Sequence, residues 1–299
     1  MKFETCAAFD SIMRKTCAGA HAQPRSRMNA ASSEPVISFE DIHLSFGEAD
    51  ILRGITFHVL PRETKVLIGE TGTGKTTILK LAAGLLKPTA GNVRVLGHDL
   101  GGMTETELLG FRREIGFVFQ EGALFDSMTV GDNVAYRLDE DGVPTEETDA
   151  RVREALGFVE MEDAIHKLPA ELSGGMRRRV SIARALVSRP PIVLYDSPTA
   201  GLDPITSQTI ITLILRLRDT QGVTSILATH RLQDAFALAN YRFDSAEKHV
   251  FKVPPSAIAS RNGQPSTNFL FLREGKVYFE GGQKAVLDSP DAYLKKFLV

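Results

Sequence analysis

The hydrophobic positions of this sequence follow two periods in turn, which predicts a protein that mixes strands and helices. Residues 37–46 and 55–59 alternate apolar and polar side chains, so we expect antiparallel strands at the edge of a core. Further strands are predicted at 65–68, 92–96, 115–119, 192–196, 223–228, 269–272 and 276–279, and helices at 77–86, 104–113 and 205–220. Because buried strands and helices alternate along most of the chain, the pattern indicates an α/β fold with a mostly parallel sheet.

Two stretches interrupt this alternation. From Val130 to Leu186 the period is mostly helical, and we place a helical subdomain at about 121–187, between strands of the sheet. Residues 241–268 are polar and contain proline, so a surface loop is predicted there in preference to a regulatory or partner-docking element. The remaining predicted boundaries are a poorly ordered N-terminal tail at 1–35, a main domain at 36–282 and a C-terminal helical tail at 283–299.

Composition narrows the class of protein. The 299 residues carry a net charge of −2, so a basic surface for nucleic acid is not indicated. Both cysteines, Cys6 and Cys17, lie near the N-terminus, which excludes a disulfide framework and favours a reducing, cytoplasmic compartment. Apolar runs fall far short of the roughly 20 residues that cross a bilayer. Glu4 and Asp10 interrupt the apolar core that a signal peptide needs, and translation from Met28 instead of the first residue is left open.

One motif organises the chain. The phosphate-binding pattern G-x-x-x-x-G-K-[ST] is matched at every fixed position, between a predicted strand and a predicted helix. Its glycines let backbone amides approach phosphate oxygens, Lys75 supplies a positive charge for the β- and γ-phosphates, and the Thr76 hydroxyl is placed to bind magnesium. The predicted nucleotide-binding residues of this loop are Gly69, Glu70, Thr71, Gly72, Thr73, Gly74, Lys75, Thr76 and Thr77.

Polar residues follow three other predicted strands. Gln120 comes at the end of one, Asp196 ends an apolar strand where a magnesium-organising carboxylate is expected, and His230 follows a third. Since ligand groups gather at the carboxyl ends of parallel strands, these residues are expected near the phosphate loop. Phe46, ahead of that loop, is able to stack on a purine ring, and a core phenylalanine is the alternative interpretation.

A second glycine-rich segment begins a predicted helix. Ser173, Gly174 and Gly175 form an anion-binding helix N-terminus in one interpretation and an ordinary helix cap in the other, with equal weight. The three arginines at 177–179, taken alone, predict a solvated helix face.

With these motifs in this order, the sequence from about Val36 onward resembles the ATP-binding cassette (ABC) ATPases. The resemblance implies a P-loop NTPase fold, ATP hydrolysis, and a head-to-tail homodimer that encloses each ATP between one phosphate loop and the other subunit's signature motif, here 172–175. It also implies that Asp203 lies in a dimer-contacting turn at 200–203 and that His230 is the switch histidine.

The resemblance further implies cofactors and partners. Mg²⁺ is expected with Thr76, Gln120 and Asp196, and Phe46 takes the place of the family's adenine-stacking aromatic residue. The subunit is expected in the cytoplasm, bound to an integral-membrane permease at the inner face of the cell membrane.

Within the family, three segments are similar to the ATPase subunits of Mce-type (Mla) lipid transporters: 116–130, 172–186 and 289–298. This similarity implies movement of phospholipid or a related lipid across the cell envelope, together with an Mce-type substrate-binding protein. Amino-acid importers share much of the surrounding pattern and are the alternative.

One catalytic position departs from the family. The family places a glutamate directly after the strand aspartate, where it orients or deprotonates the attacking water, and this chain has Ser197. A serine is a poor base near neutral pH, and three interpretations stay open. In the first, hydrolysis is slow but real, and His230 and Gln120 position the water beside Asp196 and Ser197. In the second, another carboxylate such as Glu70 takes the place of the glutamate. In the third, the protein is an ATP-binding switch or assembly subunit with almost no turnover.

A soluble cassette ATPase of translation or DNA repair is the rival from another class. That class predicts two cassettes or a large insertion facing nucleic acid. The single cassette and the absence of a basic excess argue against it.

Overall fold

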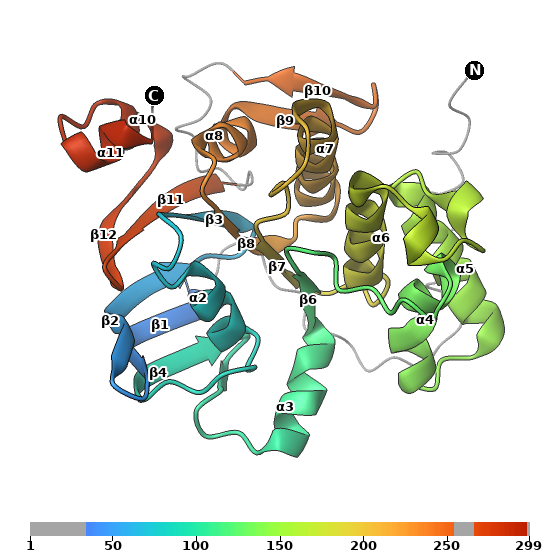
Figure 1. Cartoon of the computed structure of the whole chain (residues 1–299), viewed down its shortest axis with the longest axis horizontal. Coiled ribbons are helices and arrows are strands. Elements are labelled where there is room, and N and C mark those ends of the chain that lie inside the picture. Colours follow the sequence, from blue (N-terminus) through green and yellow to red (C-terminus); the bar gives the residue numbers. More distant parts are fainter. Residues whose placement is uncertain (1–33, 254–265, 298–299) are drawn as a thin grey trace. The chain divides into compact units, whose positions relative to one another are not determined.

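Five parallel strands and one antiparallel edge strand form the central sheet of the computed structural model, which describes residues 34–253 and 266–297. The order is β12-β11-β3-β8-β7-β6, and β12 is the antiparallel strand (Figure 1). The bounds are β3 Glu63–Ile68, β6 Ile115–Val118, β7 Ile192–Asp196, β8 Thr224–Thr229, β11 Ser266–Arg273 and β12 Lys276–Gly281. The predicted mostly parallel sheet is therefore confirmed.

A second, four-stranded sheet has the order β2-β1-β4-β5 and is antiparallel throughout. Its strands are β1 Ile37–Phe46, β2 Ala49–Val59, β4 Ala90–Val95 and β5 His98–Asp99. The two short runs expected in 37–46 form one strand, irregular near Asp41, which has a φ of 49°. This sheet is the predicted antiparallel edge subdomain.

Helices pack on both faces of the central sheet. They are α2 Lys75–Ala82, α3 Glu105–Phe111, α4 Val130–Glu140, α5 Thr145–Phe158, α6 Gly174–Leu186, α7 Pro204–Gln221, α8 Leu232–Asn240, α10 Gln283–Leu287 and α11 Ala292–Lys296. Helices α4 to α6 form the helical group that the sequence places at about 121–187 (Figure 1). No helix among the described residues is long and apolar enough to span a bilayer.

The central strands contain continuous apolar runs, such as 66–68 in β3 and 192–195 in β7, because both of their faces are covered. Along β3, Val66 and Ile68 belong to a core shared with α4 to α8, whereas Leu67 between them belongs to a core shared with α2 and the antiparallel sheet. The strand β7 divides in the same way, with Val193 on the first side and Leu194 on the second. Burial on two sides explains why these strands show no alternation of apolar and polar residues.

Helix starts follow the capping residues of the sequence. Thr104 caps α3 and Thr129 caps α4, each in a capping box with the residue three positions on. The helix after the phosphate loop begins at Lys75 and ends at Ala82, so the predicted bounds of 77–86 lie too far along the chain.

The predicted loop at 241–268 is wrong in part. The strands β9 Tyr241–Asp244 and β10 His249–Lys252 form an antiparallel hairpin, and β11 already begins at Ser266. A buried anchor holds β9: Arg218 on α7 donates to the Tyr241 carbonyl at 2.9 Å, and Asp219 accepts from the Phe243 amide at 2.8 Å. This support comes from another part of the chain, so the local pattern does not reveal it. Residues 254–265 lie outside the described residues, as do residues 1–33 of the predicted N-terminal tail, with both cysteines and Met28.

A buried ion cluster joins β3 to the edge of the sheet. Lys65 is only 2% exposed, and its Nζ lies 3.0 Å from Glu63 Oε1 and 2.6 Å from Glu280 Oε1 on β12. Burying a lysine costs several kcal/mol unless it is paired, so this cluster needs all its partners.

We expect Lys65→Met to lower the free energy of unfolding by about 3–5 kcal/mol, because it leaves the buried Glu63 carboxylate without its cation. Urea denaturation measures the loss. The double variant Lys65→Met/Glu63→Gln is expected to recover most of it, since the remaining carboxylate, Glu280, is 35% exposed and no fully buried charge is left unpaired. A single-variant loss of less than about 1 kcal/mol would show that the cluster does not hold this edge.

Candidate functional site

The phosphate loop connects β3 to α2, as the sequence predicts. Gly72 and Gly74 have φ values of 83° and 97°, which favour glycine. A Cβ on Gly69 would lie 2.7 Å from the Leu272 carbonyl oxygen, and one on Gly74 would lie 2.5 Å from the Leu52 side chain. Only glycine fits at both ends of the loop, because neighbouring strands press directly against it.

Lys75 turns its ammonium group back over this loop. Its Nζ donates to the carbonyl oxygens of Gly69 at 2.8 Å and Glu70 at 2.7 Å. Burial lowers the pKa of Lys75, and the carboxylate of Asp196 acts in the opposite direction. The loop therefore presents a cation at the N-terminus of α2, where backbone amides already favour an anion.

Thr76, Asp196 and Ser197 form an oxygen cluster beside the loop. The Thr76 hydroxyl donates to Asp196 Oδ1 at 3.2 Å, and the Ser197 hydroxyl donates to the same oxygen at 3.4 Å. Asp196 is buried at the end of β7. Hydroxyl and carboxylate oxygens are the ligands that Mg²⁺ prefers, so the donor set fits this ion. Groups of three or more acidic, histidine or cysteine side chains that could hold a metal by themselves are absent from the described residues.

Ser197 is held firmly at this position. Its φ is 47°, its amide donates to the Ala228 carbonyl at 2.9 Å, and its own carbonyl accepts from the Ala200 amide at 3.0 Å. The side chain is short, and its hydroxyl is bonded to Asp196. Position 197 therefore contributes a hydroxyl to the oxygen cluster, where a glutamate would contribute a carboxylate.

Glu70 points away from the loop and into solvent. Its Oε1 lies 2.5 Å from Nζ of Lys296 on α11, and both side chains are exposed. The hydrogen bond from Lys296, followed by its positive charge, lowers the pKa of Glu70. This arrangement does not support the interpretation that Glu70 replaces the missing catalytic glutamate.

Glu70→Gln is accordingly expected to leave turnover undiminished and to tighten ATP binding by no more than about threefold, because the exposed charge is screened. Steady-state kinetics at low and high salt measure both quantities. A general base at this position would instead show a fall of roughly 10²–10⁴-fold in rate.

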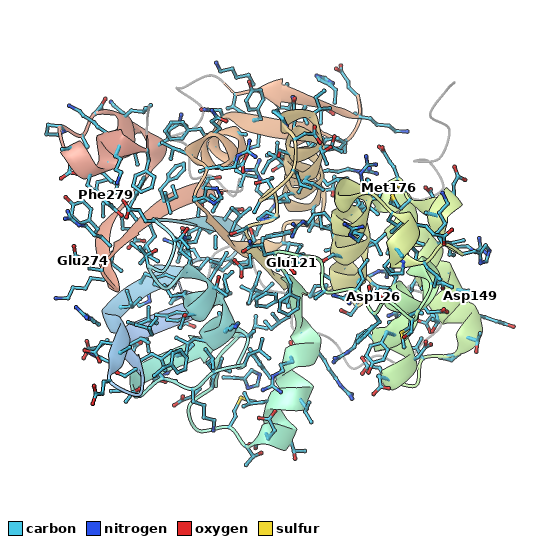
Figure 2. The ribbon with its side chains drawn as sticks, viewed as in Figure 1. Glu121, Asp126, Asp149, Met176, Glu274 and Phe279 are labelled. Carbon is cyan, nitrogen blue, oxygen red and sulfur yellow. The ribbon has the colours of Figure 1, made fainter. Side chains whose placement is uncertain are left out.

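Gln120 is exposed two residues after β6, the strand that pairs with β7. The next residue, Glu121, is exposed as well and is labelled near the middle of the view in Figure 2. His230 is also exposed, directly after β8, the other neighbour of β7. The three strand ends thus bring Gln120, Asp196 and His230 to one edge of the sheet.

The turn after Ser197 is attached to the helix after His230. The Thr199 hydroxyl donates to Asp234 Oδ2 on α8, and Arg231 donates to the Ser207 hydroxyl at 3.0 Å. Burial raises the pKa of Asp234, and the bond from Thr199 lowers it.

The signature segment packs against Leu202 of the 200–203 turn and against the first turn of α7 in its own chain. Ser173 caps α6, with its Oγ 3.3 Å from the Met176 amide, and a Cβ on Gly175 would lie 2.3 Å from Thr206 Cγ2. Asp203 caps α7 by accepting from the Thr206 amide at 3.0 Å. In Figure 1, α6 and α2 are separate, with β6 and β7 between them. The signature and the phosphate loop of one chain therefore do not form one site.

Phe46 is 54% exposed at the end of β1, so the interpretation as a core phenylalanine is wrong. An exposed ring at the start of this subdomain is free to stack on a flat ligand.

The sequence interpretation missed two arginines of α6. Arg178 is 6% exposed, and the expected solvated face is wrong for it. Arg184 donates to the carbonyls of Ala123 at 2.7 Å and Gly122 at 2.9 Å. Arg178 lies three residues after the buried Gly175 and three before the buried Ser181, and this spacing was the available signal that it belongs to the inner face of the helix.

Comparisons with known proteins agree with this geometry. The ABC transporter family model matches residues 52–200. The methionine import ATP-binding protein MetN of Brucella abortus is 35% identical over 229 residues, which cover 75% of this chain and 62% of that protein. The chain thus spans less than two thirds of the length of that relative. The protein TRIGALACTOSYLDIACYLGLYCEROL 3, chloroplastic, of Arabidopsis thaliana is 33% identical over 302 residues, covering 97% of this chain and 79% of that one.

A solved structure has the same fold. The ATP-binding cassette MJ0796, in a dimeric post-hydrolysis state bound to ADP and Pi, superposes with a TM-score of 0.68 and 28% identity. The match covers 82% of this chain and 98% of that one. The order of motifs, the fold and these relatives agree, and the chain belongs to the ABC transporter family as an ATP-binding cassette.

Proposed function

We propose that this chain is the ATP-binding and ATP-hydrolysing subunit of a membrane transporter. The observation that carries the proposal is the convergence of Lys75, Thr76 and Asp196 at one edge of the parallel sheet, next to a glycine-rich loop and a helix N-terminus. This combination attracts the phosphates of a nucleotide and offers oxygen ligands for a divalent cation.

Each residue of the site has a proposed role. Backbone amides at 69–77 bind phosphate oxygens, Lys75 leaves the carbonyls of Gly69 and Glu70 to contact the β- and γ-phosphates, and the exposed ring of Phe46 stacks on adenine. Thr76, Gln120 and Asp196 would hold Mg²⁺, which supplies neutralisation of phosphate charge. His230 and Gln120 position the attacking water, because Ser197 is no effective base.

A homodimer completes the site in this proposal. Since the signature at 173–175 lies away from the phosphate loop of its own chain, it is available to a second copy. ATP then binds the closed dimer better than the open one, and hydrolysis removes that difference. In this proposal the permease changes conformation as the dimer closes and opens. The subunit itself lies on the cytoplasmic face of the cell membrane.

The methionine import proteins among the relatives favour an amino-acid importer over the lipid transporter expected from the sequence. A lipid substrate, with an Mce-type binding protein, stays the second candidate, because the Arabidopsis relative named after a galactolipid aligns over 97% of this chain.

Two experiments test the proposal. Purification of a tagged chain from its native membranes is expected to bring with it a multi-helix permease, and a chain that instead accompanies ribosomes or DNA would contradict the transport function. Native-membrane vesicles then separate the substrates. ATP-dependent uptake of radiolabelled methionine supports the importer, and ATP-dependent transfer of labelled phospholipid supports the lipid transporter. The Lys75→Ala variant provides the background in both assays.

A further inference from the structure

Arg178 is the one residue of the 177–179 arginine run for which the structure gives a buried side chain. It lies on the inner face of α6, five residues after Ser173, the signature residue that caps the same helix. Its guanidinium contacts two segments that are distant from each other in sequence.

The first contact is to residues 119–123 around Gln120, which follow β6 and are called the glutamine loop below. Arg178 Nη1 donates to the Phe119 carbonyl oxygen at 2.7 Å, and Phe119 directly precedes Gln120. The second contact is to the dimer-contacting turn. Arg178 Nη2 lies 3.4 Å from the Ala200 carbonyl oxygen, within the turn that leads from Ser197 to Asp203. One side chain therefore joins the glutamine loop, the turn and the signature helix.

The charge of Arg178 is satisfied in an unusual way. Among the described residues, its guanidinium donates to two carbonyl oxygens and to no carboxylate, and its Nε is buried without a partner. Burial lowers the pKa of Arg178, whereas the charges of Glu121 and Asp196 raise it. A buried guanidinium is costly wherever its donors are left unpaired, so the arrangement that keeps both carbonyls in reach is favoured.

We propose that Arg178 is a positioning residue that couples the glutamine loop to the dimer-contacting turn. This inference rests on the proposed function, because it concerns how binding of ATP near Gln120 affects the surface that meets the second subunit. When the glutamine loop shifts to contact the nucleotide, the Phe119 carbonyl carries Arg178 with it. The Ala200 carbonyl then follows, and the turn adopts the position that the closed dimer needs.

Two neighbouring arginines provide comparisons. Arg184 also holds the glutamine loop, through Gly122 and Ala123, but its hydrogen bonds within the described part of the chain do not reach the turn. Arg179 follows Arg178 in sequence, and its Nη1 lies 3.9 Å from Glu160 Oε2. Arg178 variants therefore test the coupling, Arg184 variants test the stability of the glutamine loop alone, and Arg179 variants test the loss of a positive charge from the same helix.

The experiment is hydrogen–deuterium exchange of the full chain with and without a non-hydrolysable ATP analogue and Mg²⁺, on Arg178→Met, Arg178→Lys, Arg184→Met and Arg179→Met. In the wild type we expect the analogue to slow exchange at 119–123 and at 199–203. Arg178→Met should bind the analogue with wild-type affinity and keep slow exchange in the phosphate loop, but lose the nucleotide-dependent slowing at 199–203. Its kcat for ATP should fall by roughly 3- to 30-fold with little change in KM.

The variants have distinct expected results. Arg179→Met should behave as wild type, and Arg184→Met should speed exchange at 122–123 while the turn still responds to nucleotide. Arg178→Lys reaches only one carbonyl at a time and should lose the response of the turn as well, which keeps the test decisive if the methionine variant does not fold.

Two results would overturn the inference in different ways. A turn at 199–203 that still responds to nucleotide in Arg178→Met or Arg178→Lys, with kcat equal to that of Arg179→Met, would overturn the coupling and leave the proposed function intact. A wild-type protein that does not bind the analogue, with Lys75→Ala indistinguishable from it, would overturn the proposed function and the coupling together.

Discussion

Ser197→Glu is expected to raise steady-state ATP turnover by on the order of 10²-fold or more. The substitution places a carboxylate directly after Asp196, at the end of β7, where a group that accepts a proton from the attacking water is otherwise missing. A positioned general base contributes typically about 10²–10⁴-fold in rate, or roughly 3–5 kcal/mol of activation free energy. In a homodimer the change repairs both sites at once, so the full effect is visible in the purified protein.

The matched control is Ser197→Gln, because the glutamine side chain has nearly the same shape as glutamate but no carboxylate to accept a proton. We expect it to stay near the wild-type rate, so that a gain seen only with glutamate identifies the proton-accepting function. Ser197 already has a Cβ at a φ of 47°, so neither substitution adds a new backbone clash, and thermal unfolding of each variant checks that the longer side chain is accommodated.

A different result would change the mechanism. If the wild type already turns over rapidly and glutamate adds less than about tenfold, other groups position the water. The candidates are Gln120 and His230, which follow β6 and β8, the two strands that flank β7 and its Asp196. The serine would then be compatible with an active transport motor.

Lys75→Ala is expected to abolish nucleotide-dependent function, with turnover reduced by about 10²–10³-fold and ATP affinity reduced as well. The ammonium group sits over the loop carbonyls of Gly69 and Glu70, and its loss leaves the phosphates with backbone amides and the helix N-terminus alone. Titration with a fluorescent ATP analogue measures the affinity, and steady-state release of phosphate measures turnover.

Lys80→Ala is the control for this change, because Lys80 lies in the last turn of the same helix and is exposed. We expect Lys80→Ala to bind ATP like the wild type. That result would show that the loss of one positive charge from the helix does not by itself explain the effect of Lys75→Ala. ATP binding that survives Lys75→Ala unchanged would contradict the assignment of the phosphate loop.

The parts of the fold that the sequence predicts are those decided by local pattern. Ile192 to Tyr195 are all apolar because β7 is covered on both faces, and the same rule identifies the apolar runs 66–68 of β3 and 226–228 of β8. The phosphate loop is equally local, since its glycines, Lys75 and Thr76 follow one another within a few residues. Capping residues such as Thr104 likewise act on the next turn of chain.

The parts that the sequence does not predict depend on distant residues. The hairpin at 241–252 is held by Arg218 and Asp219 on α7, and without that anchor its polar residues indicate a loop. The direction of Glu70 is decided by Lys296, which is 226 residues further along the chain. Arg178 has the composition of a solvated face and becomes buried only because Phe119 and Ala200 offer their carbonyls.

The strand order has a consequence for synthesis of the protein. The strand β3, which precedes the phosphate loop, pairs with β8 and β11. Thr64 on β3 and its hydrogen-bond partner Ser225 on β8 are 161 residues apart in sequence. The other neighbour, β11, begins only at Ser266. At about 5–20 residues per second, the emerging chain holds β3 without either neighbour for roughly 8–30 s. The nucleotide site is therefore among the last parts to be assembled on the ribosome, and a chain that stops before Ser266 lacks the Leu272 carbonyl against which Gly69 packs.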